Sequence, residues 1–187
     1  MNLDDIFSQL NQDEILLFQS IMKEVSFEKG SVIIKEGQVA SNMYYIKNGA
    51  LRSFFYKYGE NISDFFFFEN SFASDFASFY SGKPSSFNLE CLEDVVALQI
   101  NREDLLILGE KHPIFERYGR IAAEYAFLLV EERMQLLHTG DLETRFRWMM
   151  KNFPAIFMRV PQYQIASYLG VKPESLSRIK SRIGKAL

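Results

Sequence analysis

The sequence of 187 residues has little of what several kinds of site require. Its single cysteine, Cys91, cannot form an internal disulfide or hold an iron–sulfur cluster, which favours a reducing compartment. Its two histidines, His112 and His138, lie outside the predicted strands, so we expect no metal-dependent active site and no haem. No candidate pair of nucleophile and base is apparent either. We therefore expect a protein that is not an enzyme and holds no metal or cofactor.

Long apolar runs are missing as well. No run approaches the roughly 20 residues that span a bilayer, and the acidic start MNLDDIFSQL differs from a signal peptide. The sequence thus predicts a cytoplasmic location without a membrane partner. A hydrophobic content of 48% and 18 phenylalanines exclude a disordered chain and indicate a core or interface rich in rings.

Charge is distributed unevenly along the chain. From Arg145 onward there are nine Lys or Arg and one acid, Glu174, a net charge of +8. The whole chain carries −3, so the first 144 residues carry −11. A basic end on an acidic body is typical of a DNA-reading module attached to a part that does not touch DNA.

The first hundred residues change from a helical to a β pattern. Residues 3–22 have helical spacing, with Asn11 as a cap for a second short helix. Glycine and asparagine turns then separate candidate strands at 31–34, 43–47, 50–56, 61–68, 86–91 and 95–101. Asn48–Gly49 predicts a two-residue type I′ hairpin. Many short strands with tight turns predict a sandwich or a barrel-like roll.

Helical patterns return after residue 101. Asn101 caps a predicted helix, and Pro113 opens a longer one that reaches about His138. Five apolar residues recur along the long helix at the spacing of a coiled-coil seam: Ile114, Tyr118, Ile121, Tyr125 and Leu128. The helix is either buried within its domain or forms a homodimer interface, and we favour the homodimer.

A break at 139–141 marks the best domain boundary. Leu142–Phe157 follows as a predicted amphipathic helix with its arginines outward. We divide the chain into a β domain (1–112), a dimerisation helix (113–138) and a DNA-binding domain (139–187).

Residues 160–183, VPQYQIASYLGVKPESLSRIKSRI, predict two short helices around a tight turn. Pro161 and Pro173 stand at first helical positions, and Gly170 supplies the turn. Each helix has one apolar stripe: Ile165, Ala166 and Leu169 on the first, and Leu176, Ile179 and Ile183 on the second. The outward face of the second helix carries Glu174, Ser175, Ser177, Arg178, Lys180, Ser181 and Arg182. An ordinary amphipathic pair has the same spacing, but these polar groups and the local charge favour a helix-turn-helix that reads DNA.

The order of these parts resembles the Crp/Fnr family of bacterial regulators, also called the cyclic-AMP receptor protein family. In the predicted β region the matching residues are Gly30, Glu36, Gly37, Tyr44, Tyr45, Ile46, Gly49, Arg52, Gly59 and Glu60. In the last helices they are Ile165, Ala166, Gly170, Glu174, Ser175, Arg178 and Ile179.

This resemblance implies an α+β fold: an antiparallel β roll of the jelly-roll type, a long dimerisation helix and a winged helix-turn-helix. It implies that Glu174 and Arg178 read bases, the first a cytosine amino group and the second a guanine. Ser175, Lys180 and Arg182 are candidates for phosphate contacts, and Ser177 lies on the same face.

Two departures from the family pattern matter. Cyclic-nucleotide members carry a glutamate and, ten residues later, an arginine that binds the phosphate, but Asp75 and Ser85 stand at these positions here. Cyclic AMP is therefore not the expected effector. An unidentified small molecule would contact Ser74, Asp75, Ser85 and Ser86, or else phenylalanines at 65–68, 72, 76 and 79 fill the pocket. The sequence also stops at Leu187, so we expect no wing and weaker DNA binding.

Two functions remain open. The chain is either a homodimeric regulator that binds a palindromic operator in double-stranded DNA, or a small-molecule sensor with weak or no DNA binding. RNA polymerase would be a further partner of an activator.

Overall fold

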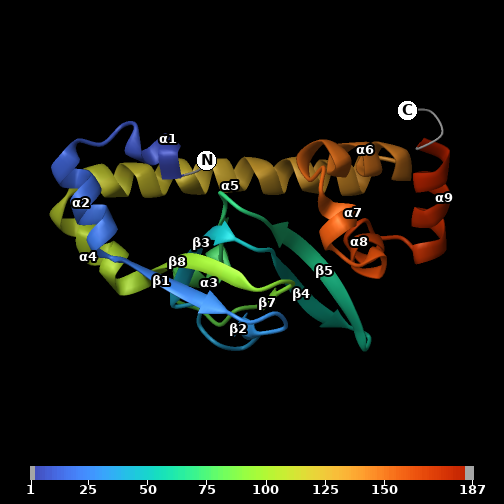
Figure 1. Ribbon diagram of the computed structural model, residues 1–187, viewed down its shortest axis with the longest axis horizontal. Coiled ribbons are helices and arrows are strands. Elements are labelled where there is room, and N and C mark those ends of the chain that lie inside the picture. Colours follow the sequence, from blue (N-terminus) through green and yellow to red (C-terminus); the bar gives the residue numbers. More distant parts are fainter. Residues whose placement is uncertain (1–2, 184–187) are drawn as a thin grey trace. The chain divides into compact units, whose positions relative to one another are not determined.

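A computed structural model describes residues 3–183, which fold into two compact units. The first unit contains the chain up to Phe55 together with Phe65–Tyr125. The second contains Tyr56–Asp64 together with the chain from Ala126. Strands β4 and β5 and the long helix α5 contribute residues to both units (Figure 1). Within the described residues, no helix is both long enough and apolar enough to cross a membrane.

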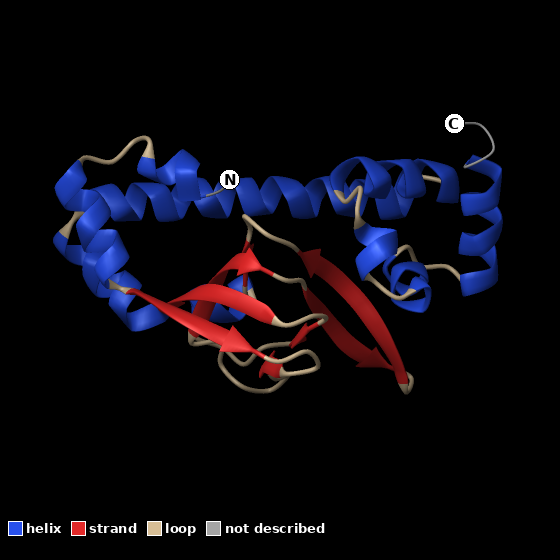
Figure 2. Cartoon of the chain, in the orientation of Figure 1, coloured by secondary structure: helices blue, strands red, loops and turns tan. Residues whose placement is uncertain are grey.

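Two antiparallel sheets of four strands form the centre of the first unit (Figure 2). One sheet has the order β1-β8-β3-β6 and the other β2-β7-β4-β5. The strands are β1 (Met22–Phe27), β2 (Val32–Ile34), β3 (Asn42–Asn48), β4 (Leu51–Lys57), β5 (Glu60–Phe67), β6 (Phe72–Ala73), β7 (Asn88–Cys91) and β8 (Val95–Asn101). A core cluster that includes Ile46, Leu51, Leu89 and Val95 is buried among these strands. The antiparallel β fold expected from the sequence is confirmed.

Along the described part of the chain, two helices precede the strands, one lies between β6 and β7, and the others follow β8. The first unit has α1 (Leu3–Phe7), α2 (Gln12–Ser20), α3 (Phe76–Ser81) and α4 (Arg102–Lys111), and α5 (Pro113–Thr139) begins in it. The second unit has the end of α5, α6 (Leu142–Asn152), α7 (Ile156–Arg159), α8 (Gln162–Tyr168) and α9 (Pro173–Ile183). The predicted caps are confirmed, since Asn11 forms a capping box with Glu14 and Asn101 caps α4.

The predicted hairpin at Asn48–Gly49 is wrong. Strands β3 and β4 belong to different sheets, so this loop is a crossover between them. Gly49 has a φ of 101°, and a Cβ there would lie 2.5 Å from the carbonyl oxygen of Asp94, so only glycine fits. The two-residue turn with positive φ at both positions occurs instead at Tyr58–Gly59, between β4 and β5.

Four other elements differ from the sequence predictions. Strands β1 and β6 were not among the predicted strands, and they form by pairing with β8 and β3. Helix α3 was not predicted. The predicted helix Leu142–Phe157 is two helices, since Pro154 disfavours helical backbone at Phe153 and α6 ends at Asn152.

Candidate functional site

Helices α8 and α9 of the second unit pack through their predicted apolar stripes. Ile165, Ala166 and Leu176 are fully buried, and Ile179 and Ile183 nearly so. Gly170 turns the chain between the helices with a φ of 68°, and the N–H of Val171 donates to the carbonyl of Ala166 at 3.0 Å. Pro173 is the first residue of α9 as predicted, but Pro161 is the cap before α8 rather than its first residue.

Arg145 on α6 supports this turn. Its Nη1 donates to the carbonyl oxygen of Leu169, the C-cap of α8, at 2.6 Å. The same atom would lie 3.5 Å from a Cβ added to Gly170. The prediction that the α6 arginines all point outward is thus wrong for Arg145. The sequence indicates this role only in general terms, because the last carbonyl groups of any helix need hydrogen-bond donors from outside it.

The polar side of α9 faces solvent. Its exposed residues are Glu174, Ser177, Arg178, Lys180, Ser181 and Arg182, and Ser175 is half-buried. Arg178 Nη2 lies 3.3 Å from the Ser175 hydroxyl, and Lys180 Nζ lies 4.4 Å from the centre of the Phe157 ring. The structure therefore places all six predicted DNA-contacting residues on one short helix, five of them exposed.

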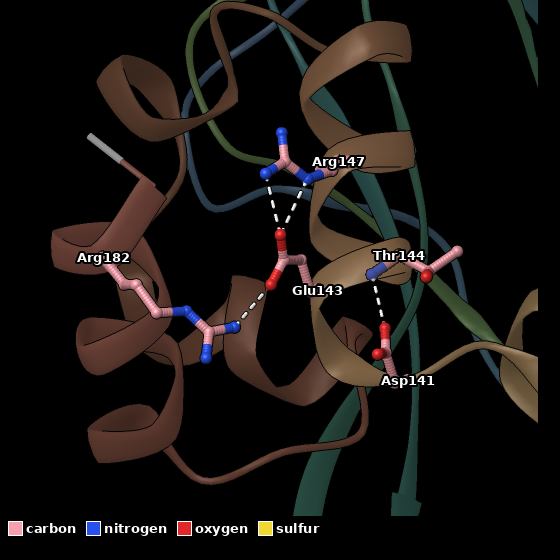
Figure 3. Close-up of polar contacts among 5 residues, drawn as sticks. All are labelled: Asp141, Glu143, Thr144, Arg147 and Arg182. Atoms are coloured by element: carbon pink, nitrogen blue, oxygen red, sulfur yellow. Dashed lines mark hydrogen bonds and ion pairs between the residues drawn. The ribbon is translucent and has the colours of Figure 1, made fainter. Parts of the chain in front are cut away.

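Arg182 is engaged with an acid that the sequence did not single out. Glu143, in the first turn of α6, accepts from Arg182 Nη2 at 2.6 Å through Oε2 (Figure 3). Its Oε1 accepts from Arg147 Nε at 3.0 Å and Nη2 at 2.7 Å. Nearby Asp141 caps α6 by accepting from the Thr144 N–H at 2.8 Å. That bond, followed by one to the Thr144 side chain and the charge of Arg182, lowers the pKa of Asp141.

The β4–β5 hairpin contributes residues of its outer part to the second unit. The N–H of Ser63 donates to Ser167 Oγ on α8 at 3.0 Å. Arg133 on α5 pairs with Asp64 at 2.9 Å and lies 4.5 Å from the centre of the Tyr168 ring. Burial of Tyr168 raises its pKa to about 12. These contacts fix α8 against the hairpin, and no sequence pattern indicated them.

The predicted seam residues of α5 lie in different surroundings. Ile114 and Tyr118 are partly buried and pack against a core cluster of the first unit that includes Ile6, Phe18 and Phe115. Ile121 is half-buried, whereas Tyr125 and Leu128 are exposed. In the second unit, α5 exposes a further apolar stripe at spacings of three, four and three residues: Phe127, Val130, Met134 and Leu137.

The four candidate ligand residues in the roll bind one another or the backbone. Asp75 caps α3 by accepting from the Ser78 N–H at 3.0 Å through Oδ1. Its Oδ2 accepts from the buried Ser85 hydroxyl at 2.7 Å and from the Ser86 N–H at 3.3 Å. Ser74 Oγ donates to the carbonyl of Asn42 at 3.0 Å. Asp75, Ser85 and Ser86 are thus joined by hydrogen bonds within the protein, whereas Ser74 bonds to the backbone of β3.

Phenylalanine rings pack beside this cluster. Phe79 and Phe67 are buried in the core of the roll, and Phe65, Phe72 and Phe76 pack against that core. Cys91 lies in the same core, where burial and then the charges of Glu90 and Asp94 raise the pKa of its thiol to about 11. Among the described residues, no group of three or more His, Cys, Asp or Glu could hold a metal ion.

Comparison with known proteins agrees with the architecture. Residues 24–112 match the family model of the cyclic nucleotide-binding domain. No curated protein matches the sequence. FixK2 from Bradyrhizobium japonicum has a similar structure, with a TM-score of 0.78 and 19% identity over 89% of this chain and 86% of its own.

Two other solved structures are also similar. A protein described as a Crp/Fnr-family transcriptional regulator, from Eubacterium rectale, gives a TM-score of 0.72 and 16% identity over 97% of this chain and 87% of its own. The catabolite activator protein of Thermus thermophilus gives a TM-score of 0.58 and 20% identity over 95% of this chain and 85% of its own. The chain thus shares its fold with these proteins, one of them described as a Crp/Fnr-family regulator, and carries in residues 24–112 a match to the cyclic nucleotide-binding domain.

Proposed function

We propose that this protein is a sequence-specific DNA-binding transcription regulator of the Crp/Fnr type, with α8 and α9 as its helix-turn-helix. The observation that carries the proposal is the two-sided character of α9. Leu176, Ile179 and Ile183 hold the helix against its own unit, while Glu174 and Arg178 project from the opposite, exposed side. A helix presented in this way can enter a major groove.

The residues on the exposed side of α9 have distinct proposed roles. The carboxylate of Glu174 accepts from a cytosine amino group, and the guanidinium of Arg178 donates to a guanine. Ser175, Ser177, Lys180 and Arg182 contact phosphates or groove edges. The net charge of +8 from Arg145 onward supports attraction to the DNA backbone.

The active form is proposed to be a homodimer on a palindromic operator. Phe127, Val130, Met134 and Leu137 repeat on α5 at the spacing of a coiled-coil seam, which suits a second copy of the same helix. Exposed Tyr125 and Leu128 would extend the interface. Two recognition helices related by a twofold axis match half-sites about 34 Å apart.

A small-molecule sensor with weak DNA binding is the second candidate, favoured by the family match over residues 24–112. In either case we propose an effector other than cyclic AMP. The Asp75 carboxylate bonds to Ser85, where a bound cyclic phosphate would need a cation. RNA polymerase would be a partner if the protein activates transcription in the cytoplasm. The expectation about a wing concerns residues 184–187, which lie outside the described residues.

The direct test is selection of DNA by the purified protein. Random genomic fragments of the source organism are enriched on the full chain at about 150 mM salt and sequenced. An enriched inverted repeat with half-sites one helical turn apart supports the regulator. Arg178→Ala should then weaken binding and relax the base preference at one position of each half-site, whereas Lys23→Ala, an exposed change in β1, should do neither. Unchanged preference in Arg178→Ala would remove its base-reading role.

The dimer has its own test. Val130→Glu places a charge in the exposed stripe of α5 and should convert dimers to monomers in sedimentation velocity. Leu106→Glu places the same charge at an exposed apolar residue of α4 and should leave the dimer intact. Dimers that persist in Val130→Glu would exclude this stripe as the seam.

A further inference from the structure

Glu143 is the link between two cationic side chains of the second unit. Its two carboxylate oxygens are divided between them, Oε1 for Arg147 on the same helix and Oε2 for Arg182 on α9 (Figure 3). The two arginines are 35 residues apart in sequence, and one carboxylate holds both.

The pairs that Glu143 makes are open to solvent. The side chains of Arg147 and Arg182 are 57% and 66% exposed, and that of Glu143 is 35% exposed. Exposed ion pairs of this kind are screened by salt and contribute little to folding, so they exchange partners readily.

A shallow hollow lies at the same place. It is lined by Asp141, Leu142, Glu143, Ser175, Arg178, Ile179 and Arg182. Ser175, Arg178 and Arg182 supply a hydroxyl and two guanidinium groups, the donors that phosphate contacts use. One of these donors, Arg182, already donates a hydrogen bond to an anion, the carboxylate of Glu143.

We propose that Glu143 competes with a phosphodiester of the DNA backbone for Arg147 and Arg182. The inference rests on the proposed DNA-binding function and specifies its regulation. A planar guanidinium donates to carboxylate and phosphate oxygens in the same way, and the Glu143 carboxylate repels a phosphate, so the two anions compete for these donors. Binding is therefore weaker and less dependent on salt than the arginine content implies, and Arg147 joins the DNA-contacting set.

The test measures binding of the full chain to a labelled duplex of random sequence as the salt concentration is varied. Glu143→Gln keeps the side-chain shape and removes the charge. It should bind about tenfold more tightly at low salt, and its slope of log affinity against log salt should be steeper by about one to two. Glu24→Gln, which breaks the exposed pair with Lys47 in the first unit, is the matched control and should have a much smaller effect.

The gain should depend on the arginines. Added to Arg147→Ala/Arg182→Ala, Glu143→Gln should have no more effect than Glu24→Gln. If Glu143→Gln binds like the control or more weakly than wild type, the competition is overturned while DNA binding stands. If neither wild type nor Glu143→Gln binds duplex DNA at low salt, the proposed DNA function fails, and the inference with it.

Discussion

Asp75 in the first unit and Glu143 in the second are both carboxylates that gather donors from more than one segment. The donors to Asp75 are a hydroxyl and two backbone N–H groups, and its partner Ser85 is buried. The donors to Glu143 are two arginine side chains that are more than half exposed. The chemistry of the acceptor is the same, but its donors are neutral and fixed in one case and charged and flexible in the other.

This difference indicates what each cluster can do. Removing Asp75 would leave the N–H of buried Ser78 without its capping acceptor and would leave the Ser85 hydroxyl with the Phe87 carbonyl alone, which is costly, so the cluster stabilises the roll. Arg147 and Arg182 would lose little if Glu143 left them, because water solvates them. The first cluster therefore has a structural role, and the second can exchange its anion for another.

The largest effect is expected from Asp75→Ala. The substitution removes the cap of α3 and one of the two acceptors of the Ser85 hydroxyl, and should lower the free energy of unfolding by about 2 kcal/mol. Urea unfolding followed by far-UV circular dichroism measures it. Asp75→Asn keeps a capping oxygen, so its free energy of unfolding should fall by less than that of Asp75→Ala. A midpoint equal to that of wild type in Asp75→Ala would show that the cluster is not structural.

A smaller effect is expected from Glu143→Gln on the same measurement. The free energy of unfolding should fall by no more than about 0.5 kcal/mol, because both pairs are exposed. The loss should vanish near 1 M NaCl, where charges are screened within about 3 Å, whereas the loss in Asp75→Ala should persist. A salt-insensitive loss as large as that of Asp75→Ala would remove the distinction between the clusters.

Asp141 provides the smallest and most specific test, because it is exposed but bonds to a backbone N–H. Its pKa lies below the ordinary value of 3.8, chiefly through the Thr144 N–H. A lowered pKa in the folded state stabilises the fold above about pH 4, and the contribution is lost as the pH falls through the folded pKa.

The measurement compares urea midpoints of wild type and Asp141→Asn between pH 7 and pH 3. Asparagine also caps helices but does not titrate, so the urea midpoint of Asp141→Asn should fall less steeply below pH 4 than that of wild type. Asp104→Asn, in the first turn of α4, removes an equal charge elsewhere. Parallel curves for wild type and Asp141→Asn would show that the cap carries no pH dependence.

Parts of the candidate site could be predicted because their causes are local. The stripes of α8 and α9 follow from helical periodicity, and their burial is confirmed at Ile165 and Leu176. Asp75 and Ser85 were singled out because they stand at two positions of the family's phosphate cassette, and the structure joins them at 2.7 Å, a bond that was not predicted. The partners of Arg145, Arg147 and Arg182 were not predicted, since a long side chain reaches many positions and its partner depends on packing.

The sequence by itself determined the helix caps, the amphipathic faces of the last helices and the basic character of the region after Arg145. These depend on residues within one or two turns of each other or on simple counting. Only the tertiary structure decided that β3 and β4 lie in different sheets and that the type I′-like turn is at Tyr58–Gly59. It also decided that Glu143 meets Arg182 across 39 residues. Strand pairing and side-chain partners are settled by which distant surfaces pack together, and local spacing carries no information about that choice.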